Sequence, residues 1–355
     1  MQLFAILDDI TFTALVHLLS AIFAICTEEL SIINIRTVPR KSHILTSPED
    51  RHLLPDDLDP QIQIHTDGIS ILGTAIGADD FVAEFLNAKL QQTEALLIKV
   101  NCIPSLQFRY QILKFSINSR LRHLLRSLSS SRPPVSNFCK SFDQLTQGFF
   151  MQTFHIQEPS DTLSLQLSMS TSYAGMGILS LQHMASVAYL ASLRNMLGEF
   201  IVRNAHSVDV NQLLTLWSFE QDAKWHWDNH HLLVDQMQNS GEYTQWNHVN
   251  FLALPQQGTQ RRLQQAYSRA LYTFLFSLVD QRRAIKILSA AGHGASAFLH
   301  APESLPGCSM SNQEFEIAVK LRLGTKIYPL LPEKCSCGET LDAAGDHLLK
   351  CKRGK

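Results

Sequence analysis

The sequence predicts a mainly α-helical protein with small β elements, and three observations indicate this fold class. From residue 81 onward, apolar residues recur at spacings of three and four, which is typical of amphipathic helices. Short apolar runs bounded by turn residues, which indicate strands, gather before residue 80. The chain has 355 residues, of which 45% are hydrophobic and 17% charged, so it can bury a sizeable core.

The first ten residues predict a β-hairpin. Two adjacent acids, Asp8 and Asp9, lie between short apolar runs, and aspartate tolerates turns because its side chain bonds nearby backbone N–H groups. Two carboxylates on a rigid turn also form a hard oxygen site for Mg²⁺, as phosphoryl transfer requires. The alternative is an ordinary polar turn, because Asp-Asp recurs at residues 56–57 and 79–80.

The apolar run at residues 10–26 predicts a buried helix, expected over residues 14–30. A membrane anchor is the alternative interpretation of this run. No basic region precedes it, the two acids interrupt it early, and its length is at the short limit for a bilayer span. We therefore expect no membrane partner.

Short strands are expected next, separated by a loop. Residues 42–45 predict one strand, and the Asp- and Pro-rich residues 47–60 predict a loop. Residues 62–76 are predicted to form a strand, a turn at Asp67-Gly68 and a second strand.

A basic helix is predicted over residues 106–125. Although the net charge is only −2, residues 99–132 hold seven Lys or Arg and no acid. Such a segment can pair with phosphates, and a solvated helix face is the alternative. The basic residues of this helix and its end are Arg109, Lys114, Arg120, Arg122 and Arg126.

The remaining middle of the chain is expected to be largely helical. Residues 127–137, rich in Ser and Pro, predict a linker. Helices are expected over residues 138–154 and 184–205, and residues 208–283 are polar and rich in Gln.

A cysteine–histidine cluster near the end predicts a zinc site. Three thiolates and one imidazole make a closed tetrahedral set, and the four ligands are Cys335, Cys337, His347 and Cys351. Gly338 would let the chain turn, and Asp342 and Asp346 lie near enough to accept hydrogen bonds around the metal. Unconnected free cysteines are the alternative. The odd total of seven cysteines favours reduced thiols, hence an intracellular protein, nuclear or cytoplasmic.

In order and spacing, these features resemble the C-terminal half of reverse transcriptases from non-LTR retrotransposons. The similar class has a polymerase followed by a cysteine–histidine knuckle and a restriction-like endonuclease. The matching stretches are the Asp-Asp hairpin at 6–10, with Ile6 where an aromatic residue is usual, a lysine-bearing palm segment at 40–45, a primer-grip hairpin at 68–77, a thumb helix at 120–126, a Gly-x-Gly block at 174–178 and the knuckle at 335–351.

The resemblance implies four regions. These are a partial palm over residues 1–80, a helical thumb over 81–206, a helical connector over 207–330 and a zinc knuckle over 331–355. It assigns catalysis and Mg²⁺ binding to Asp8 and Asp9. It assigns RNA or DNA contacts to six basic residues, which are Lys41, Arg109, Lys114, Arg120, Arg122 and Arg126.

The resemblance also implies a fragment. RNA-directed DNA polymerases need a third carboxylate, expected upstream of the hairpin, so we expect weak Mg²⁺ binding and no DNA synthesis by this chain alone. Residual nucleic-acid binding and Zn²⁺ binding are expected to persist. The alternative is a zinc-knuckle protein that binds nucleic acid or acts as a scaffold and has no polymerase ancestry.

Overall fold

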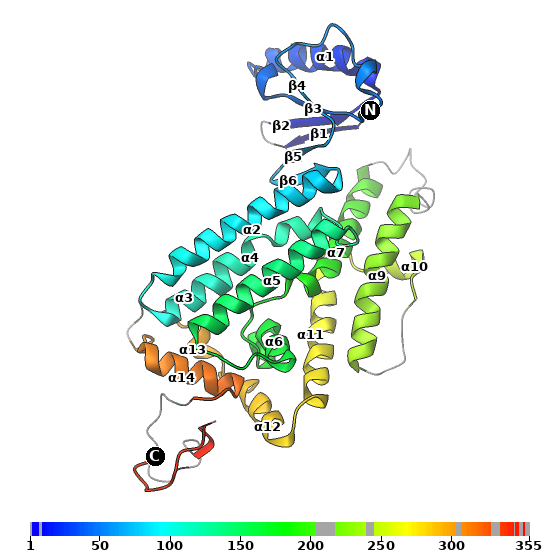
Figure 1. The fold of residues 1–355 in the computed structure, drawn as a ribbon. Coiled ribbons are helices and arrows are strands. Elements are labelled where there is room, and N and C mark those ends of the chain that lie inside the picture. Colours follow the sequence, from blue (N-terminus) through cyan, green and yellow to red (C-terminus); the bar gives the residue numbers. More distant parts are fainter. Residues whose placement is uncertain are drawn as a thin grey trace. The chain divides into compact units, whose positions relative to one another are not determined.

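The computed structural model describes residues 2–6, 9–203, 217–238, 245–302, 305, 307–327, 334–343, 345–347 and 351. The chain forms two compact units, Met1–Phe85 and Leu86–Lys355, and each is described by itself. Helices dominate and the sheets are small (Figure 1), which confirms the predicted fold class. The finer division into four regions stays a prediction.

The first unit begins with two paired strands. β1 (Gln2–Ile6) runs antiparallel to β2 (Asp9–Thr13), and Ile6 lies opposite Asp9. The apolar runs on either side of the two acids thus form strands as predicted. Asp8 lies outside the described residues.

The helix predicted after this hairpin is present, but its predicted burial is wrong. A short 3-10 helix (Val16–Leu18) leads into α1 (Leu19–Ile32), in which Ile22 is buried. The side chains of Ile25 and Ile32 are 57% and 71% exposed. Because the isoleucines of α1 are not confined to one face, a neighbour that covers one face leaves other apolar side chains uncovered.

A membrane-spanning role for this run is not supported by its length. The fourteen residues of α1 rise about 21 Å, against roughly 30 Å for the hydrocarbon core of a bilayer. Among the helices described, none is both long enough and apolar enough to cross a membrane.

The strands at residues 43–77 form two separate pairs. β3 (His43–Leu45) runs parallel to β4 (Gln63–His65), while β5 (Gly68–Ile71) forms an antiparallel hairpin with β6 (Thr74–Gly77). The predicted strand-turn-strand over residues 62–76 is therefore wrong in its pairing. The hairpin turn is at Leu72-Gly73, where both residues have positive φ, of 50° and 77°. This conformation matches the tight turns that connect adjacent antiparallel strands.

The second unit consists of packed helices, with α2 (Asp79–Asn101) leading into it. A nearly continuous helical run follows over residues 106–126: α3 (Leu106–Ile112), a π-helical turn (Leu113–Ile117), α4 (Asn118–Arg120) and a 3-10 turn (Arg122–Arg126). The later helices are α5 (Pro133–Thr153), α6 (Asp161–Ser168), α7 (Leu181–Arg203), α9 (Trp217–Gln238), α10 (His248–Leu252), α11 (Thr259–Ser277), α12 (Gln281–Ala290), α13 (Ala297–His300) and α14 (Asn312–Leu323). Further 3-10 turns are Pro39–Lys41, Arg51–Leu53 and Thr171–Tyr173.

The predicted linker at residues 127–137 is wrong. Leu128, Ser129 and Ser130 are buried, and α5 already begins at Pro133. Proline is favoured in the first turn of a helix because its missing N–H would have no partner there. The Arg-Pro-Pro sequence therefore starts a helix instead of extending a flexible segment.

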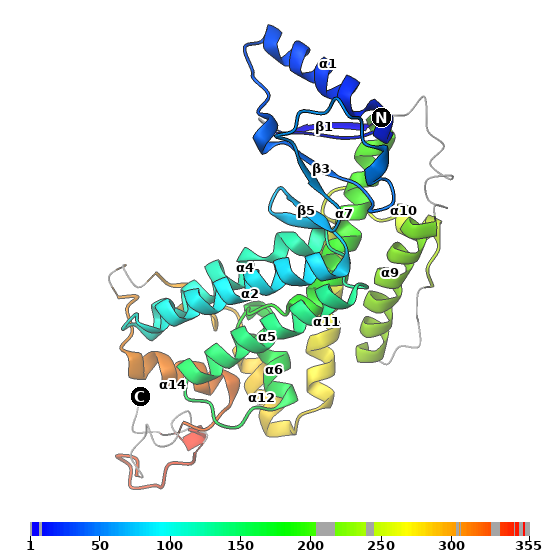
Figure 2. The same cartoon turned by 45° about the horizontal axis from the view of Figure 1, so that its top comes forward.

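Aromatic packing joins segments that are far apart in the sequence. The rings of Phe150 on α5 and Phe154, directly after α5, lie 4.6 Å apart. The ring of Phe315 on α14 lies 5.9 Å from those of both Phe154 and Tyr110 of α3. Aromatic side chains bury a large apolar area and therefore contribute strongly to the stability of a core. This cluster fixes α14, which lies beside α12 in both views of the ribbon (Figure 1, Figure 2). The segment that holds the cysteine–histidine cluster packs against these two helices.

Candidate metal centre

A tight loop brings the first two thiols together. Lys334 and Thr340 form an antiparallel bridge, and the N–H of Cys335 donates to the carbonyl of Glu339 at 2.9 Å. The N–H of Gly338 donates to the carbonyl of Cys335 at 2.8 Å, and Gly338 has a φ of +92°. A residue without a Cβ adopts that conformation readily. The turn predicted at Gly338 is confirmed.

A backbone hydrogen bond joins the second pair of candidate ligands. The N–H of Cys351 donates to the carbonyl of His347 at 2.8 Å, which is the i to i+4 bond of an α-helix. The carboxylate of Asp342 accepts from the N–H of Asp346 at 3.1 Å and from that of His347 at 2.8 Å. Asp342 therefore fixes the backbone of Asp346 and His347.

The four ligand atoms converge as predicted. They lie within 4.8 Å of one another, with Sγ of Cys335 3.5 Å from Sγ of Cys351, and Sγ of Cys337 3.1 Å from Nε2 of His347. In a tetrahedral zinc site, Zn–S bonds of about 2.3 Å and Zn–N bonds of about 2.0 Å put neighbouring ligands roughly 3.5 to 3.8 Å apart. The donor set therefore fits one zinc ion.

The two thiols of the loop differ in acidity. The backbone N–H of Cys337, followed by the thiol of Cys351, lowers the pKa of Cys335 to about 6. At Cys337 the N–H of Glu339 lowers the pKa, but burial and the neighbouring thiols raise it more, so its pKa is raised. Without metal, one thiol of the loop therefore ionises more readily than the other, and the hydrogen-bonded cluster stabilises a single thiolate. Because thiolates are the ligand form, metal binding must release the remaining protons.

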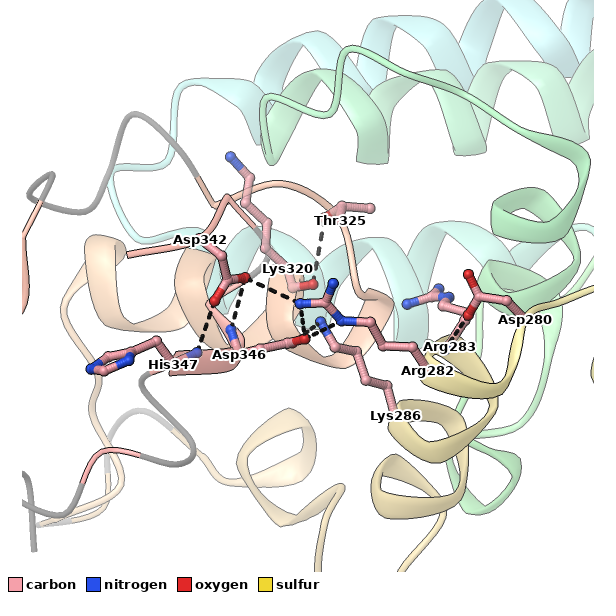
Figure 3. A network of polar contacts seen from close by, with 9 residues as sticks. All are labelled: Asp280, Arg282, Arg283, Lys286, Lys320, Thr325, Asp342, Asp346 and His347. Carbon is pink, nitrogen blue, oxygen red and sulfur yellow. Dashed lines mark hydrogen bonds and ion pairs between the residues drawn. The ribbon is translucent and has the colours of Figure 1, made fainter. Parts of the chain in front are cut away.

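Two cations on α12 contact the segment that carries the candidate ligands (Figure 3). This segment, residues 334–343 and 345–347, is called the metal loop. Asp346, which is buried, pairs with Arg282 and lies 2.5 Å from Nζ of Lys286. Hydrogen bonding from Lys286 is the largest cause that lowers the pKa of Asp346. Arg282 also lies 3.6 Å from Asp342. Asp346 therefore attaches the metal loop to α12. Asp342 accepts a hydrogen bond from the backbone N–H of His347 and not from its imidazole ring.

Close packing adds a second attachment to the end of α14. The N–H of Ile327 donates to the carbonyl of Ala343 at 2.7 Å. A Cβ on Gly345 would lie 2.6 Å from Cδ1 of Ile327 and 3.2 Å from Cδ2 of Leu321, and Gly345 has a φ of +72°. Only glycine fits this close approach without strain.

The predicted nucleic-acid residues do not share one exposed surface. Lys41 is exposed in the first unit, and Arg120 and Arg126 are exposed in the second. The Nε of Arg109 donates to the carbonyl of Ile103. The two remaining residues are withdrawn from solvent, since Lys114 is buried and Arg122 is half-buried.

The predicted Mg²⁺ pair is not placed by the structure. Asp8 lies outside the described residues. Asp9 is the first residue of β2, but its side chain is also outside the described part. The magnesium site stays a prediction.

A buried polar network was not anticipated from the sequence. The Oγ of Ser129 donates to Asp222 at 3.0 Å and lies 2.9 Å from Nε2 of His226. Asp222 contacts the serine and not the imidazole, and both Ser129 and His226 are buried, so this set is not a catalytic triad. It ties residues 129–131 to α9. The paired residues are more than ninety positions apart in the sequence, so no local sequence pattern predicts this network.

Of the five basic side chains of the predicted helix and its end, Lys114 is the one that the structure buries, at 9% exposure. Its neighbours include Gly177, on which a Cβ would lie 2.9 Å from Cε of Lys114, and this contact joins positions more than sixty residues apart in the sequence.

No family model, curated protein or solved structure matches this chain. What the chain does is therefore inferred from its own residues.

Proposed function

We propose that this chain is a zinc-binding, nucleic-acid-binding segment related to the reverse transcriptases of non-LTR retrotransposons, and that alone it synthesises no DNA. One observation carries the proposal. The ligand atoms of Cys335, Cys337, His347 and Cys351 converge within 4.8 Å of one another, at the place where the resemblance expects a knuckle. The order of elements before the cluster supports the same ancestry.

The metal would have a structural role. Three thiolates and Nε2 of His347 would fill all four positions of a tetrahedral ion, so no position remains for a water or a substrate. The ion would join the loop at residues 334–340 to His347 and Cys351. So small a segment has little core of its own, and its folding would be linked to metal binding.

The polymerase-like part is proposed to be inactive by itself. The resemblance assigns metal binding to Asp8 and Asp9, of which Asp9 begins β2, and a primer-grip hairpin to β5 and β6. Two-metal phosphoryl transfer by such polymerases uses a third carboxylate, and none of the acids in the sequence is assigned that role. Mg²⁺ would therefore bind weakly, and a primer-extension assay with Mg²⁺ or Mn²⁺ is expected to yield no template-dependent product.

Metal analysis of the purified chain tests the zinc part. We expect one zinc per chain in the wild type and none in Cys351→Ser, which removes one thiolate ligand. Cys102→Ser is the matched control, because Cys102 is an exposed free cysteine outside the cluster. A zinc-free wild type, or a Cys351→Ser chain that keeps its zinc, would contradict the proposal.

Fluorescence anisotropy with a labelled single-stranded RNA tests the nucleic-acid part. We expect binding that weakens with salt, since it would depend on phosphate contacts. Arg120→Gln should reduce the slope of log affinity against log salt by about one. Lys140→Gln, on an exposed position of α5, should leave the slope unchanged. Salt-independent binding, or equal slopes in all three proteins, would overturn the assignment of Arg120.

A second candidate function is a zinc-containing scaffold without polymerase ancestry. The contacts of Asp346 with Arg282 and Lys286 favour it, because they build the zinc loop into the fold. Stoichiometric zinc together with no RNA or DNA binding at low salt would select this function over the first.

A further inference from the structure

One lysine of the second unit is buried without an acceptor. Lys114 lies in the π-helical turn after α3 and is 9% exposed. Within the described part of the chain, its Nζ makes no hydrogen bond and no ion pair. Its nearest aromatic neighbours are Phe115 and Tyr110, whose ring centroids lie 4.9 Å and 5.7 Å away. Ring faces offset only part of the cost of removing an ammonium from water.

The groups around Lys114 add positive charge. Arg322 is near enough to lower the pKa of Lys114 further, after burial has lowered it, to about 8 in all. The guanidinium of Arg322 is fixed, because it donates to four carbonyls: Thr171, Gly175, Ala290 and Ala295. These acceptors are neutral, so the charge of Arg322 is solvated without being cancelled. Lys114 is still mostly protonated at neutral pH.

Thr171 stands at the centre of this arrangement. Its carbonyl accepts from Arg322 at 2.6 Å, and its Oγ1 lies 3.0 Å from Nε2 of His300. A Cβ on Gly177 would lie 3.4 Å from Nζ of Lys114 and 3.6 Å from Cγ2 of Thr171, so both side chains border the same glycine. Lys114, Thr171 and His300 therefore bring three hydrogen-bonding groups to one place.

Buried charges are normally paired, because an unpaired ion leaves several kcal/mol of lost hydration uncompensated. Here the counter-charge is not supplied by any carboxylate that the structure describes. The three groups beside Arg322 suit a ligand that offers several oxygens and more than one negative charge, as a phosphate does.

We propose that Lys114, Thr171 and His300 form a binding site for a phosphate group, with Arg322 as the fixed positive charge behind it. On the solvent side of the site lie Phe115, which is 55% exposed, and the exposed His300, whose ring centroids are 6.1 Å apart. Exposed side chains change rotamer within nanoseconds, so these two rings can turn aside to admit the ligand. The phosphate is either free or part of a nucleic-acid backbone, and the second of these sources rests on the proposed function.

Inorganic phosphate is the first probe, used with the full zinc-loaded chain. We expect the ³¹P line of phosphate to broaden with the wild type and with Lys140→Met, which removes an exposed lysine of α5. Lys114→Met should abolish the broadening, and Thr171→Val should weaken binding about tenfold, the loss of one hydrogen bond to a charged group. Equal broadening by Lys114→Met and wild type would overturn the site.

Thermal unfolding supplies a second readout that does not depend on a single variant. Phosphate should raise the Tm of the wild type in a saturable way, and chloride at equal ionic strength should not. Without ligand, Lys114→Met should melt no lower than the wild type, because it removes an unpaired buried charge. A Tm that rises equally with chloride would show mere screening and would reject the site.

An unlabelled single-stranded oligonucleotide separates the two sources of phosphate. If it removes the ³¹P broadening and binds Lys114→Met more weakly, the site takes a backbone phosphate. If the broadening persists, the site takes a free phosphate. Oligonucleotide binding that is unchanged in Lys114→Met, with no phosphate broadening in any protein, would reject this site and leave the proposed function standing.

Discussion

The Nζ atom of Lys286 lies 2.5 Å from Oδ1 of Asp346, the residue directly before His347 of the candidate metal centre (Figure 3). Asp346 also pairs with Arg282 one helical turn earlier on α12. Two cations on a packed helix therefore face one buried carboxylate of the metal loop. This arrangement links the position of a metal ligand to the helical unit, since Asp342 in turn fixes the His347 backbone.

Replacing the carboxylate should weaken metal binding. In Asp346→Asn the two cations of α12 lose their anionic partner, and we expect zinc affinity to fall by about tenfold, as for other groups that support metal ligands. Competition with a chromogenic chelator measures this. Glu339→Gln is the control, because Glu339 is an exposed acid in the same loop. Equal losses in both variants would indicate a general charge effect and not the contact with α12.

Removing zinc should loosen the metal loop and leave the helical core intact. The loop depends on few buried apolar contacts, whereas α5 is held by the Phe150–Phe154 pair and by Phe315. Hydrogen exchange after treatment with EDTA should therefore accelerate at residues 334–340 and remain slow at residues 142–150. Loss of protection in both segments would show instead that the metal supports the whole unit.

Asp143 should be a strong determinant of stability, because it caps a helix to which it does not belong. From α5 its carboxylate accepts from Oγ of Ser180 at 2.5 Å, from the N–H of Leu181 at 2.7 Å and from the N–H of Gln182 at 3.2 Å. Asp143→Ala should lower the free energy of unfolding by about 2 to 4 kcal/mol, through lost bonds and unsatisfied buried donors. Urea titration measures the change. Lys140→Ala, one turn earlier on the exposed side, should change it little.

Stability should fall as the pH drops from about 6.5 towards 4. Burial lowers the pKa of His226 to about 4 and that of His183 to about 4, against 6.5 in an unfolded chain. The unfolded state therefore binds more protons in this window, so the stabilisation is complete above pH 6.5 and is lost as the pH falls through it. Each histidine contributes up to about 3 kcal/mol by this linkage.

Asp143 acts in the opposite direction over part of the same window. Burial raises its pKa to about 6, although its three donors oppose the rise, so its carboxyl favours the folded state more at pH 4 than at pH 7. The combined effect of the two histidines is larger than that of the one aspartate. The free energy of unfolding should therefore rise with pH between about 4 and 6.5. His226→Gln should make this rise shallower in urea titrations at several pH values. An unchanged slope in that variant would exclude His226 as a source.

Local patterns predicted much of this chain because they depend on neighbours in the sequence. Helical spacing of apolar residues predicted the helices near residues 81–90, 106–125 and 138–154. The spacing of Cys335, Cys337, His347 and Cys351 predicted their convergence, since each pair of ligands is separated by only one or three residues.

Burial and pairing were not predictable in the same way. Whether α1 is covered, whether β4 joins β3 or β5, and whether Lys114 faces solvent all depend on segments distant in the sequence. The serines at 129–131 have the composition of a linker, yet Asp222 and His226 on α9 hold them inside.

By itself, then, the sequence determined the helical class and the cysteine–histidine cluster, because backbone periodicity and short loops act over a few residues. Only the tertiary structure decided which charges are buried, as at Lys114, and which are anchored, as at Asp346. Burial is a property of the packed whole, in which each side chain is enclosed by partners that its own neighbourhood in the chain does not specify.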